Sequence, residues 1–274
     1  MKNGYLICAV SCVGLLFSYN SVAEKTSLIT AGTFNMGCSV GDSLCEKDEV
    51  AQGGVGVYVN EFRIDTHEVS VGKYQQCVKK GRCKIPDTHK KNKYCNYGAQ
   101  QRENHPVNCI DWQDALEYCH WKGGRLPYEA EWEKAARAGS KTAYPWGNKV
   151  DCQQAIVDDG KTSGSVPDEP DGCGEDRTWP VGSRKANAFG LYDMHGNAGE
   201  WTANWYAPGA IEKLYAKSNL SGPERGRKKV VRGGSWDENT GNLRSSYRNT
   251  KRPVSGESIY GSIGFRCVYD MTNQ

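Results

Sequence analysis

The chain has 274 residues, of which 24% are charged, and carries a formal net charge of only +3 at pH 7. Acidic residues offset its basic clusters, so the sequence lacks the one-sided basic stripe that is typical of nucleic-acid-binding proteins, and these clusters are interpreted as solvated loops. After the N-terminus no segment approaches the roughly 20 apolar residues that span a bilayer, so the sequence predicts no membrane span.

The N-terminal segment predicts a secretory signal peptide. Lys2 precedes a mostly apolar run over residues 5–17, and a small-x-small cleavage pattern ends at Ala23. We therefore expect residues 1–23 to be removed and the protein to be exported, either to a periplasm or outside the cell. Residues 24–274 contain no linker, heptad repeat or low-complexity tract, which favours a single domain. We expect it to be a monomer.

Two strands and a short helix are expected first. Residues 28–38 resemble a strand that breaks at Gly32, and residues 55–65 alternate apolar and polar side chains as a second strand does. Ser70 can then cap a short helix. The buried face of this helix is expected to contain Val71, Tyr74 and either Cys77 or Val78.

Two further helices follow before the regular pattern ends. Asp111 can cap a helix whose inner face is expected to contain Trp112, Leu116 and Cys119. A third helix should begin after Pro127 and point Trp132, Ala135 and Ala136 inward. After Gly139, glycine, aspartate and asparagine dominate, so helix and strand should cover less than half of the chain. The sequence thus predicts an irregular α+β domain with little regular secondary structure.

Ten cysteines follow the predicted cleavage site, an even number in a chain that we expect to enter an oxidising compartment. The sequence does not fix their connectivity, but short loops favour four local disulfides. These are Cys38 with Cys45, Cys77 with Cys83, Cys95 with Cys109, and Cys152 with Cys173. Cys119 and Cys267 remain and lie far apart. A metal centre is disfavoured because the chain has no Cys-x-x-Cys or paired His/Cys spacing.

Four motifs in the second half of the chain carry a family resemblance. They are Trp146-Gly147-Asn148, Gly-Asn-Ala-Gly-Glu-Trp at 196–201, Arg-Gly-Gly-Ser-Trp at 232–236, and Gly-Phe-Arg-Cys at 264–267. With them, residues 28–270 resemble the formylglycine-generating enzyme (sulfatase-modifying factor) family, a variant of the C-type-lectin-like fold.

The resemblance has two structural implications. It implies a disulfide between Cys119 and Cys267, because the family joins the cysteine of a Tyr-Cys-x-Trp helix to the terminal Gly-Phe-Arg-Cys. It also implies a weaker start to the third helix, because the family usually has threonine where this chain has Tyr128. The loss of such a cap costs about 1 kcal/mol.

The catalytic residues of the family have no counterparts here. The oxidase of this family binds Cu(I) with two cysteine thiolates that precede Gly-Phe-Arg-Cys, and it converts a target cysteine to formylglycine. This chain has no cysteine between Cys173 and Cys267, and the matching positions are Arg244 and Asn249. Cu(I) selects soft thiolates, which neither residue supplies. We therefore expect no bound copper, no catalytic residues of this type and no formylglycine-generating activity.

The resemblance also implies a structural calcium ion. In the family a turn with the pattern Asn-x-x-Gly-Asn-Ala-x-Glu binds calcium. Here that turn offers the carboxylates of Asp193 and Glu200 and the backbone carbonyls of Gly196 and Ala198, which are the hard oxygen ligands that calcium prefers. The alternative is that Glu200 and Asn197 only satisfy backbone donors of the turn.

The region that replaces the copper site suggests a binding role. Its candidate ligand groove consists of Trp236, Ser246, Tyr247, Arg248 and Asn249, and Trp, Tyr and Arg are the residues most enriched in binding hot spots. We interpret the chain as an exported pseudoenzyme that binds a protein, peptide or glycan. One alternative is a periplasmic enzyme with a different oxidative or modifying chemistry, as family relatives in siderophore maturation suggest. The other is a structural component of the cell envelope.

Overall fold

A computed structural model describes residues 25–271 except for 88–89, 159–172, 175–176 and 255–259. The predicted signal peptide, residues 1–23, lies outside the described residues. Among the described residues, no helix has both the length and the apolar character needed to cross a bilayer.

Three small sheets and four short helices make up the regular structure. The sheets have the strand orders β1 (Thr26–Ile29), β4 (Phe62–Asp65), β9 (Val268–Asp270); β2 (Gly32–Met36), β3 (Val55–Val59); and β7 (Asn249–Lys251), β6 (Lys229–Arg232), β5 (Gly199–Trp205), β8 (Ile263–Gly264). The helices are α1 (Val71–Lys79), α2 (Trp112–Trp121), α3 (Glu129–Arg137) and α4 (Ala210–Lys213), with 3-10 helices η1 (Lys47–Glu49), η2 (Tyr215–Lys217) and η3 (Thr240–Leu243). Neighbouring strands are antiparallel except for the parallel pair β5 and β8. The predicted irregular α+β class is confirmed.

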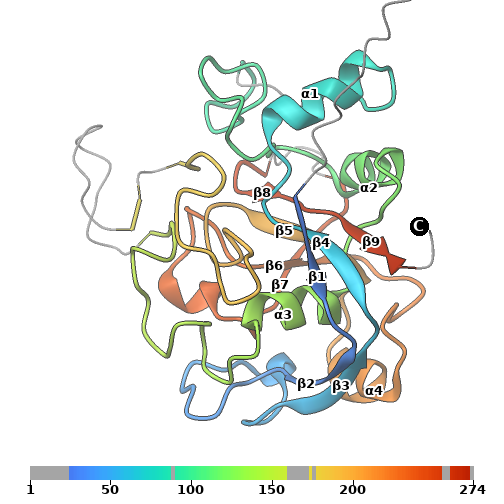
Figure 1. Ribbon diagram of the computed structural model, residues 1–274, viewed down its shortest axis with the longest axis vertical. Coiled ribbons are helices and arrows are strands. Elements are labelled where there is room, and N and C mark those ends of the chain that lie inside the picture. Colours follow the sequence, from blue (N-terminus) through green and yellow to red (C-terminus); the bar gives the residue numbers. More distant parts are fainter. Residues whose placement is uncertain (1–24, 88–89, 159–172, 175–176, 255–259, 272–274) are drawn as a thin grey trace, which may run out of the picture.

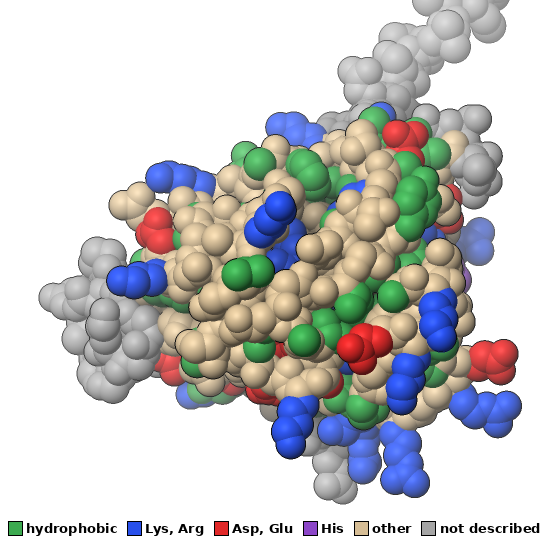
Figure 2. Space-filling view, turned by 90° about the horizontal axis from the view of Figure 1, so that it is seen from below, with side chains coloured by type: hydrophobic (Ala, Val, Ile, Leu, Met, Phe, Trp, Pro, Cys, Tyr) green, Lys and Arg blue, Asp and Glu red, His purple; other side chains and the backbone are tan. Residues whose placement is uncertain are grey.

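Helix α3 lies at the centre of this arrangement. It contacts the β2–β3 hairpin and also strands β5 and β6. In Figure 1 the hairpin and α4 lie at the lower end of the molecule, and α1 and α2 lie at the upper end. Figure 2 views the lower end, where hydrophobic side chains are scattered and Lys and Arg side chains are spread along the lower and right edges.

The two regions that were predicted to form strands do so, but each contains two strands instead of one. Residues 28–38 form β1 and β2, and the break falls at 30–31, so that Gly32 begins the second strand. The single strand predicted over residues 55–65 is wrong, because β3 and β4 are separate strands. They separate because β3 pairs with β2, from Gly32 opposite Val59 onward, whereas β4 pairs with β1 and β9.

The first two helices differ in how well their sequences predict burial. In α1 the Ser70 hydroxyl accepts a hydrogen bond from the Lys73 backbone N–H (3.4 Å), and the predicted inner face is buried. In α2 the buried residues are Ala115, Tyr118 and Cys119, whereas the predicted Trp112 and Leu116 are only half-buried. The face is rotated because the Tyr118 ring packs against the rings of Tyr74 (5.6 Å) and Phe265 (5.4 Å).

Helix α3 buries Trp132, Ala135 and Ala136 as predicted. Its N-terminus compensates for the missing threonine through Glu131, whose carboxylate accepts a hydrogen bond from the Tyr128 backbone N–H (2.7 Å). The negative charge of this carboxylate also interacts favourably with the positive end of the helix dipole.

Five disulfides join distant and local parts of the fold. They are Cys38–Cys45, Cys77–Cys83, Cys95–Cys109, Cys119–Cys267 and Cys152–Cys173, the same five pairs that the sequence analysis names. Cys119–Cys267 has a sequence separation of 148 and ties α2 to the segment before β9. Within the described residues every cysteine is therefore part of a disulfide.

Candidate functional site

Arg244, which the sequence analysis matches to the first copper-binding cysteine of the family, is a buried arginine. The Arg244 side chain is about 2% exposed, and its guanidinium forms two hydrogen bonds with Glu49 (2.6 and 2.7 Å) and one with Asp42 (3.0 Å). Both carboxylates come from the loop between β2 and β3. This loop therefore closes over Arg244.

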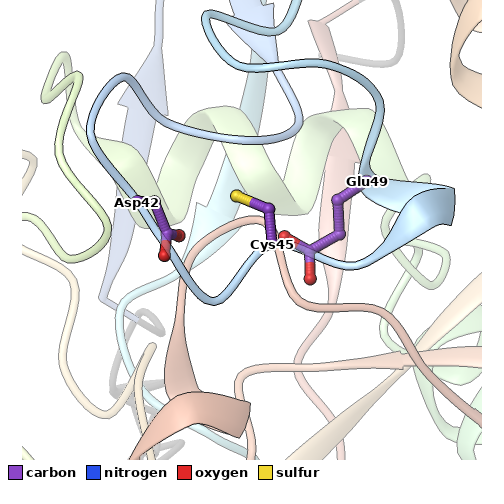
Figure 3. A group of neighbouring side chains, drawn as sticks. All are labelled: Asp42, Cys45 and Glu49. Carbon is purple, nitrogen blue, oxygen red and sulfur yellow. The ribbon is translucent and has the colours of Figure 1, made fainter.

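Figure 3 shows two acids and a cysteine of this cluster that lie close together. The side-chain ligand atoms of Asp42, Cys45 and Glu49 all lie within 4.8 Å of one another. However, the Cys45 sulfur is bonded to Cys38, and Arg244 Nη1 lies 3.8 Å from that sulfur. The guanidinium thus already occupies the space between the two carboxylates and binds both of them.

A second ion network lies beside the first. Arg248 donates two hydrogen bonds to Glu129 (2.7 and 2.9 Å), and Arg232 bridges Glu129 (3.1 Å) and Glu133 (2.6 Å). Arg137 also binds Glu133 (2.8 Å). All five side chains are buried, so removal of any one would leave an uncompensated charge.

Asn249, which the sequence analysis matches to the second copper-binding cysteine of the family, pairs with a carboxylate. The Asn249 amide donates a hydrogen bond to Glu238 Oε1 (2.7 Å). Glu238 Oε2 is buried and has no hydrogen-bond partner among the described residues. Burial raises the pKa of Glu238 above its usual value. The Glu238 carboxyl group therefore retains its proton more readily than an exposed glutamate does. Neither Asn249 nor Glu238 supplies the soft ligands that Cu(I) requires.

The predicted groove residues lie mainly inside the protein. Trp236, Ser246 and Arg248 are buried, and Tyr247 and Asn249 are half-buried. These five residues therefore do not form an open surface by themselves.

A solvent-facing pocket of about 590 Å³ lies next to them. It is lined by Cys45, Glu46, Lys47, Asp48, Tyr206, Pro208 and Gly209. The Asp48 carboxylate accepts a hydrogen bond from the Tyr206 hydroxyl (2.9 Å) and lies 3.6 Å from Arg248, which connects the pocket to the buried network. Sequence reasoning missed this pocket because its two walls come from segments about 160 residues apart.

The predicted calcium ligands lie on one tight turn. Asp193, Gly196 and Asn197 have φ values of 56°, 85° and 61°, which bend the backbone sharply. The Asp193 carboxylate accepts a hydrogen bond from the Gly182 N–H (2.6 Å). The fit to calcium is incomplete, because the Glu200 carboxylate already interacts with another charged group.

That group is the Arg266 guanidinium, which donates to Glu200 at 2.7 to 2.9 Å. The Trp132 indole N–H also donates to Glu200 (2.7 Å). The alternative that Glu200 and Asn197 serve backbone donors holds for Asn197, whose side-chain oxygen accepts a hydrogen bond from the Trp179 N–H (2.8 Å), whereas the partners of Glu200 are side chains.

Glu68 is a buried acid that sequence reasoning did not place at this turn. Its carboxylate accepts hydrogen bonds from the Ala198 N–H (2.9 Å) and the Asn197 amide (2.6 Å). Burial, together with the nearby charges of Asp193 and Glu200, raises the pKa of Glu68 well above its usual value. Burial also raises the pKa of Asp193 to about 6. No spacing rule links Glu68 to a turn about 130 residues away.

Residues 16–271 match the sulfatase-modifying factor enzyme 1-like domain, which is the domain of the formylglycine-generating enzymes. The chain belongs to this family. The family resemblance inferred from the four motifs is thereby confirmed.

Curated members of the family align with about three fifths of this chain. Mouse formylglycine-generating enzyme is 37% identical over 177 residues, which cover 62% of this chain and 45% of that protein. The enzyme from Thermomonospora curvata is 37% identical over 176 residues, covering 62% and 57%. The mouse inactive C-alpha-formylglycine-generating enzyme 2 is 34% identical over 176 residues, covering 62% and 51%. The chain therefore spans about half the length of these relatives.

Solved structures match over more of the chain. PvdO from Pseudomonas aeruginosa is 26% identical, covers 90% of this chain and 94% of its own, and superposes with a TM-score of 0.71. CarF is 20% identical, covers 91% and 99%, and superposes with a TM-score of 0.63, which shows a common fold. The irregular fold of the formylglycine-generating enzyme family is thus shared along nearly the whole described chain.

Proposed function

We propose that this family member is an exported ligand-binding protein without copper oxidase activity. The observation that carries the proposal is the Arg244 cluster. At the position of a copper-binding thiolate, a guanidinium is held by the buried carboxylates of Asp42 and Glu49. A guanidinium at this position supplies none of the soft ligands that Cu(I) requires. Export is supported by the five disulfides, since such bonds persist in oxidising compartments.

The ligand site that we propose is the pocket beside this cluster. Tyr206 and Pro208 provide an aromatic and an aliphatic surface, and Glu46, Lys47 and Asp48 provide charged groups around them. This combination of few polar groups with an aromatic wall suits a peptide or glycan segment of a larger partner. The pocket replaces the groove as the proposed surface because it faces solvent.

A binding screen with matched variants tests this role. The exported, purified protein would be applied to a glycan array and to a displayed peptide library. For any ligand found, Lys47→Glu should weaken binding by roughly tenfold or more, because Lys47 lines the pocket. Lys217→Glu, an exposed lysine outside the pocket lining, makes the same charge change and should leave binding unaltered. Equal affinities of all three proteins would place the ligand elsewhere.

The alternative of a different enzymatic chemistry has one specific observation in its favour. Glu238 is a carboxylic acid with a raised pKa beside Asn249, and perturbed titratable groups cluster at functional sites. Under this alternative the purified protein would show turnover that Glu238→Gln abolishes. Stoichiometric redox metal in the wild-type protein would also favour an enzyme over a binding protein.

Structural calcium is a second proposal. The proposal is supported by the Asp193 carboxylate, which lies on the same turn as the carbonyls of Gly196 and Ala198. Calcium binding would require the Glu200 carboxylate to contact both the ion and Arg266. Calcium that binds only the folded protein should raise the melting temperature, and Glu200→Gln should remove most of the gain. An unchanged melting temperature after chelation, with no ion detected, would show that the turn holds no calcium.

A further inference from the structure

One end of the molecule carries most of its excess positive charge. The residues from the end of α1 through the following loop, 79–87 and 90–94, contain seven basic side chains and one acidic side chain. The basic residues are Lys79, Lys80, Arg82, Lys84, Lys90, Lys91 and Lys93. The whole chain has a net charge of +3, so the remainder of the chain is net negative. In Figure 1 this basic face lies at the upper end, beside α1.

Most of these charges have no carboxylate partner among the residues that the structure describes. Lys84 lies 3.8 Å from Asp114, and Lys91 lies 2.6 Å from Asp87. None of the other five has a carboxylate within 4.0 Å among the described residues, and all seven side chains are exposed. An exposed surface of one sign attracts a polyanion over about 8–10 Å at moderate salt.

An exposed apolar side chain distinguishes this face from a purely electrostatic one. Ile85 is 65% exposed and lies directly after Lys84 in the middle of the basic segment. Tyr94 is 38% exposed, and the Lys93 ammonium lies 4.9 Å from the centre of its ring. A nucleic acid or a charged glycan would not stabilise an isoleucine, whereas a lipid interface would bury it.

We propose that this basic face docks on the surface of an anionic lipid bilayer. The lysines and arginine attract the headgroups, and Ile85 enters the interface between headgroups and acyl chains. The Cys77–Cys83 disulfide ties the start of the segment to α1, and the Cys95–Cys109 disulfide follows its end, so both described ends are held to the fold before docking. Membrane attachment of this kind leaves the pocket, which is built by other segments, available for its ligand.

Vesicle sedimentation tests the proposal. Protein purified after export should bind vesicles that contain phosphatidylglycerol, should bind pure phosphatidylcholine vesicles much less, and should dissociate as salt rises. The triple variant Lys80→Gln/Arg82→Gln/Lys90→Gln should lower the partition constant on the order of 100-fold, from about fivefold per charge. Ile85→Ser should lower it roughly five- to tenfold with the charge unchanged.

A second triple variant controls for net charge. Arg225→Gln/Arg227→Gln/Lys228→Gln removes three exposed charges from another basic segment. It should lower the partition constant less than about tenfold, compared with about 100-fold for the first triple variant. Unchanged melting temperatures would show that all variants fold.

Three results would overturn the proposal. The first is the absence of binding at low salt, and the second is equal losses for the two triple variants. The third is tighter binding to heparin or DNA than to vesicles, with Ile85→Ser having no effect, which would assign the face to a soluble polyanion.

Discussion

Replacing Arg244 by alanine removes the cation that two buried acids share. Glu49 is fully buried and Asp42 is 6% exposed, so neither carboxylate can be hydrated once the guanidinium is gone. Breaking a buried ion pair by removing one partner costs about 3–5 kcal/mol. This is a large part of a total stability of about 5–15 kcal/mol. For a chain of this size the melting temperature should fall by roughly 6–20 °C.

Urea unfolding followed by tryptophan fluorescence measures this loss as a lower midpoint with an unchanged slope. The matched control is Arg82→Ala, because Arg82 is exposed and its loss should change stability by less than about 0.5 kcal/mol. A triple variant, Arg244→Met/Glu49→Gln/Asp42→Asn, should recover most of the stability, since it removes all the charges together.

A loss below about 1 kcal/mol for Arg244→Ala would refute the assignment of Arg244 as the centre of a buried ion network. The same reasoning predicts that Arg244→Cys destabilises the protein, although it restores a thiol at the family's copper position. A simple reversal of the substitution should therefore be insufficient to rebuild the oxidase.

Two further predictions concern the disulfides and the pH dependence of stability. Loss of the Cys119–Cys267 disulfide by serine substitution should lower the free energy of unfolding by up to about 5 kcal/mol, against about 2 kcal/mol for Cys77–Cys83. The difference arises because the first disulfide closes a loop with a sequence separation of 148 and the second a loop with a separation of 6. Equal losses in urea unfolding would contradict this. Burial lowers the pKa of His195 from 6.5 to about 4. Between pH 6.5 and pH 4 the unfolded chain therefore binds a proton at His195 that the folded protein does not bind. The free energy of unfolding should fall by about 3 kcal/mol as the pH drops through this range. His195→Gln should remove that part of the acid sensitivity, and an NMR titration showing a pKa near 6.5 would disprove it.

The elements that the sequence predicted well depend on local signals. Ser70 caps α1, and the apolar positions of α3 face inward, because both follow from residues within one or two helical turns. The four motifs identified the family because they stand in a fixed order along the chain. The face of α2 was misplaced because the rings of Tyr74 and Phe265, which lie outside that helix, decide its orientation.

The ion network could not be predicted from the sequence. Glu129 appears in the sequence only as an acid in the first turn of a helix, yet its partners are Arg232 and Arg248, which are more than 100 residues away. No periodicity or spacing links these residues. The absence of cysteines between Cys173 and Cys267 predicts the loss of the copper site, whereas only the structure shows that Asp42 and Glu49 hold Arg244.

The central claim is that the Arg244 cluster has replaced the copper centre of the family. The most direct test incubates the copper-loaded protein under oxygen with a Cys-x-Pro-x-Arg peptide and measures the peptide by mass spectrometry, with the Thermomonospora curvata formylglycine-generating enzyme as positive control. We predict that the cysteine stays intact and that the protein retains no stoichiometric Cu(I). Conversion of the cysteine to formylglycine at an enzymatic rate would contradict this account.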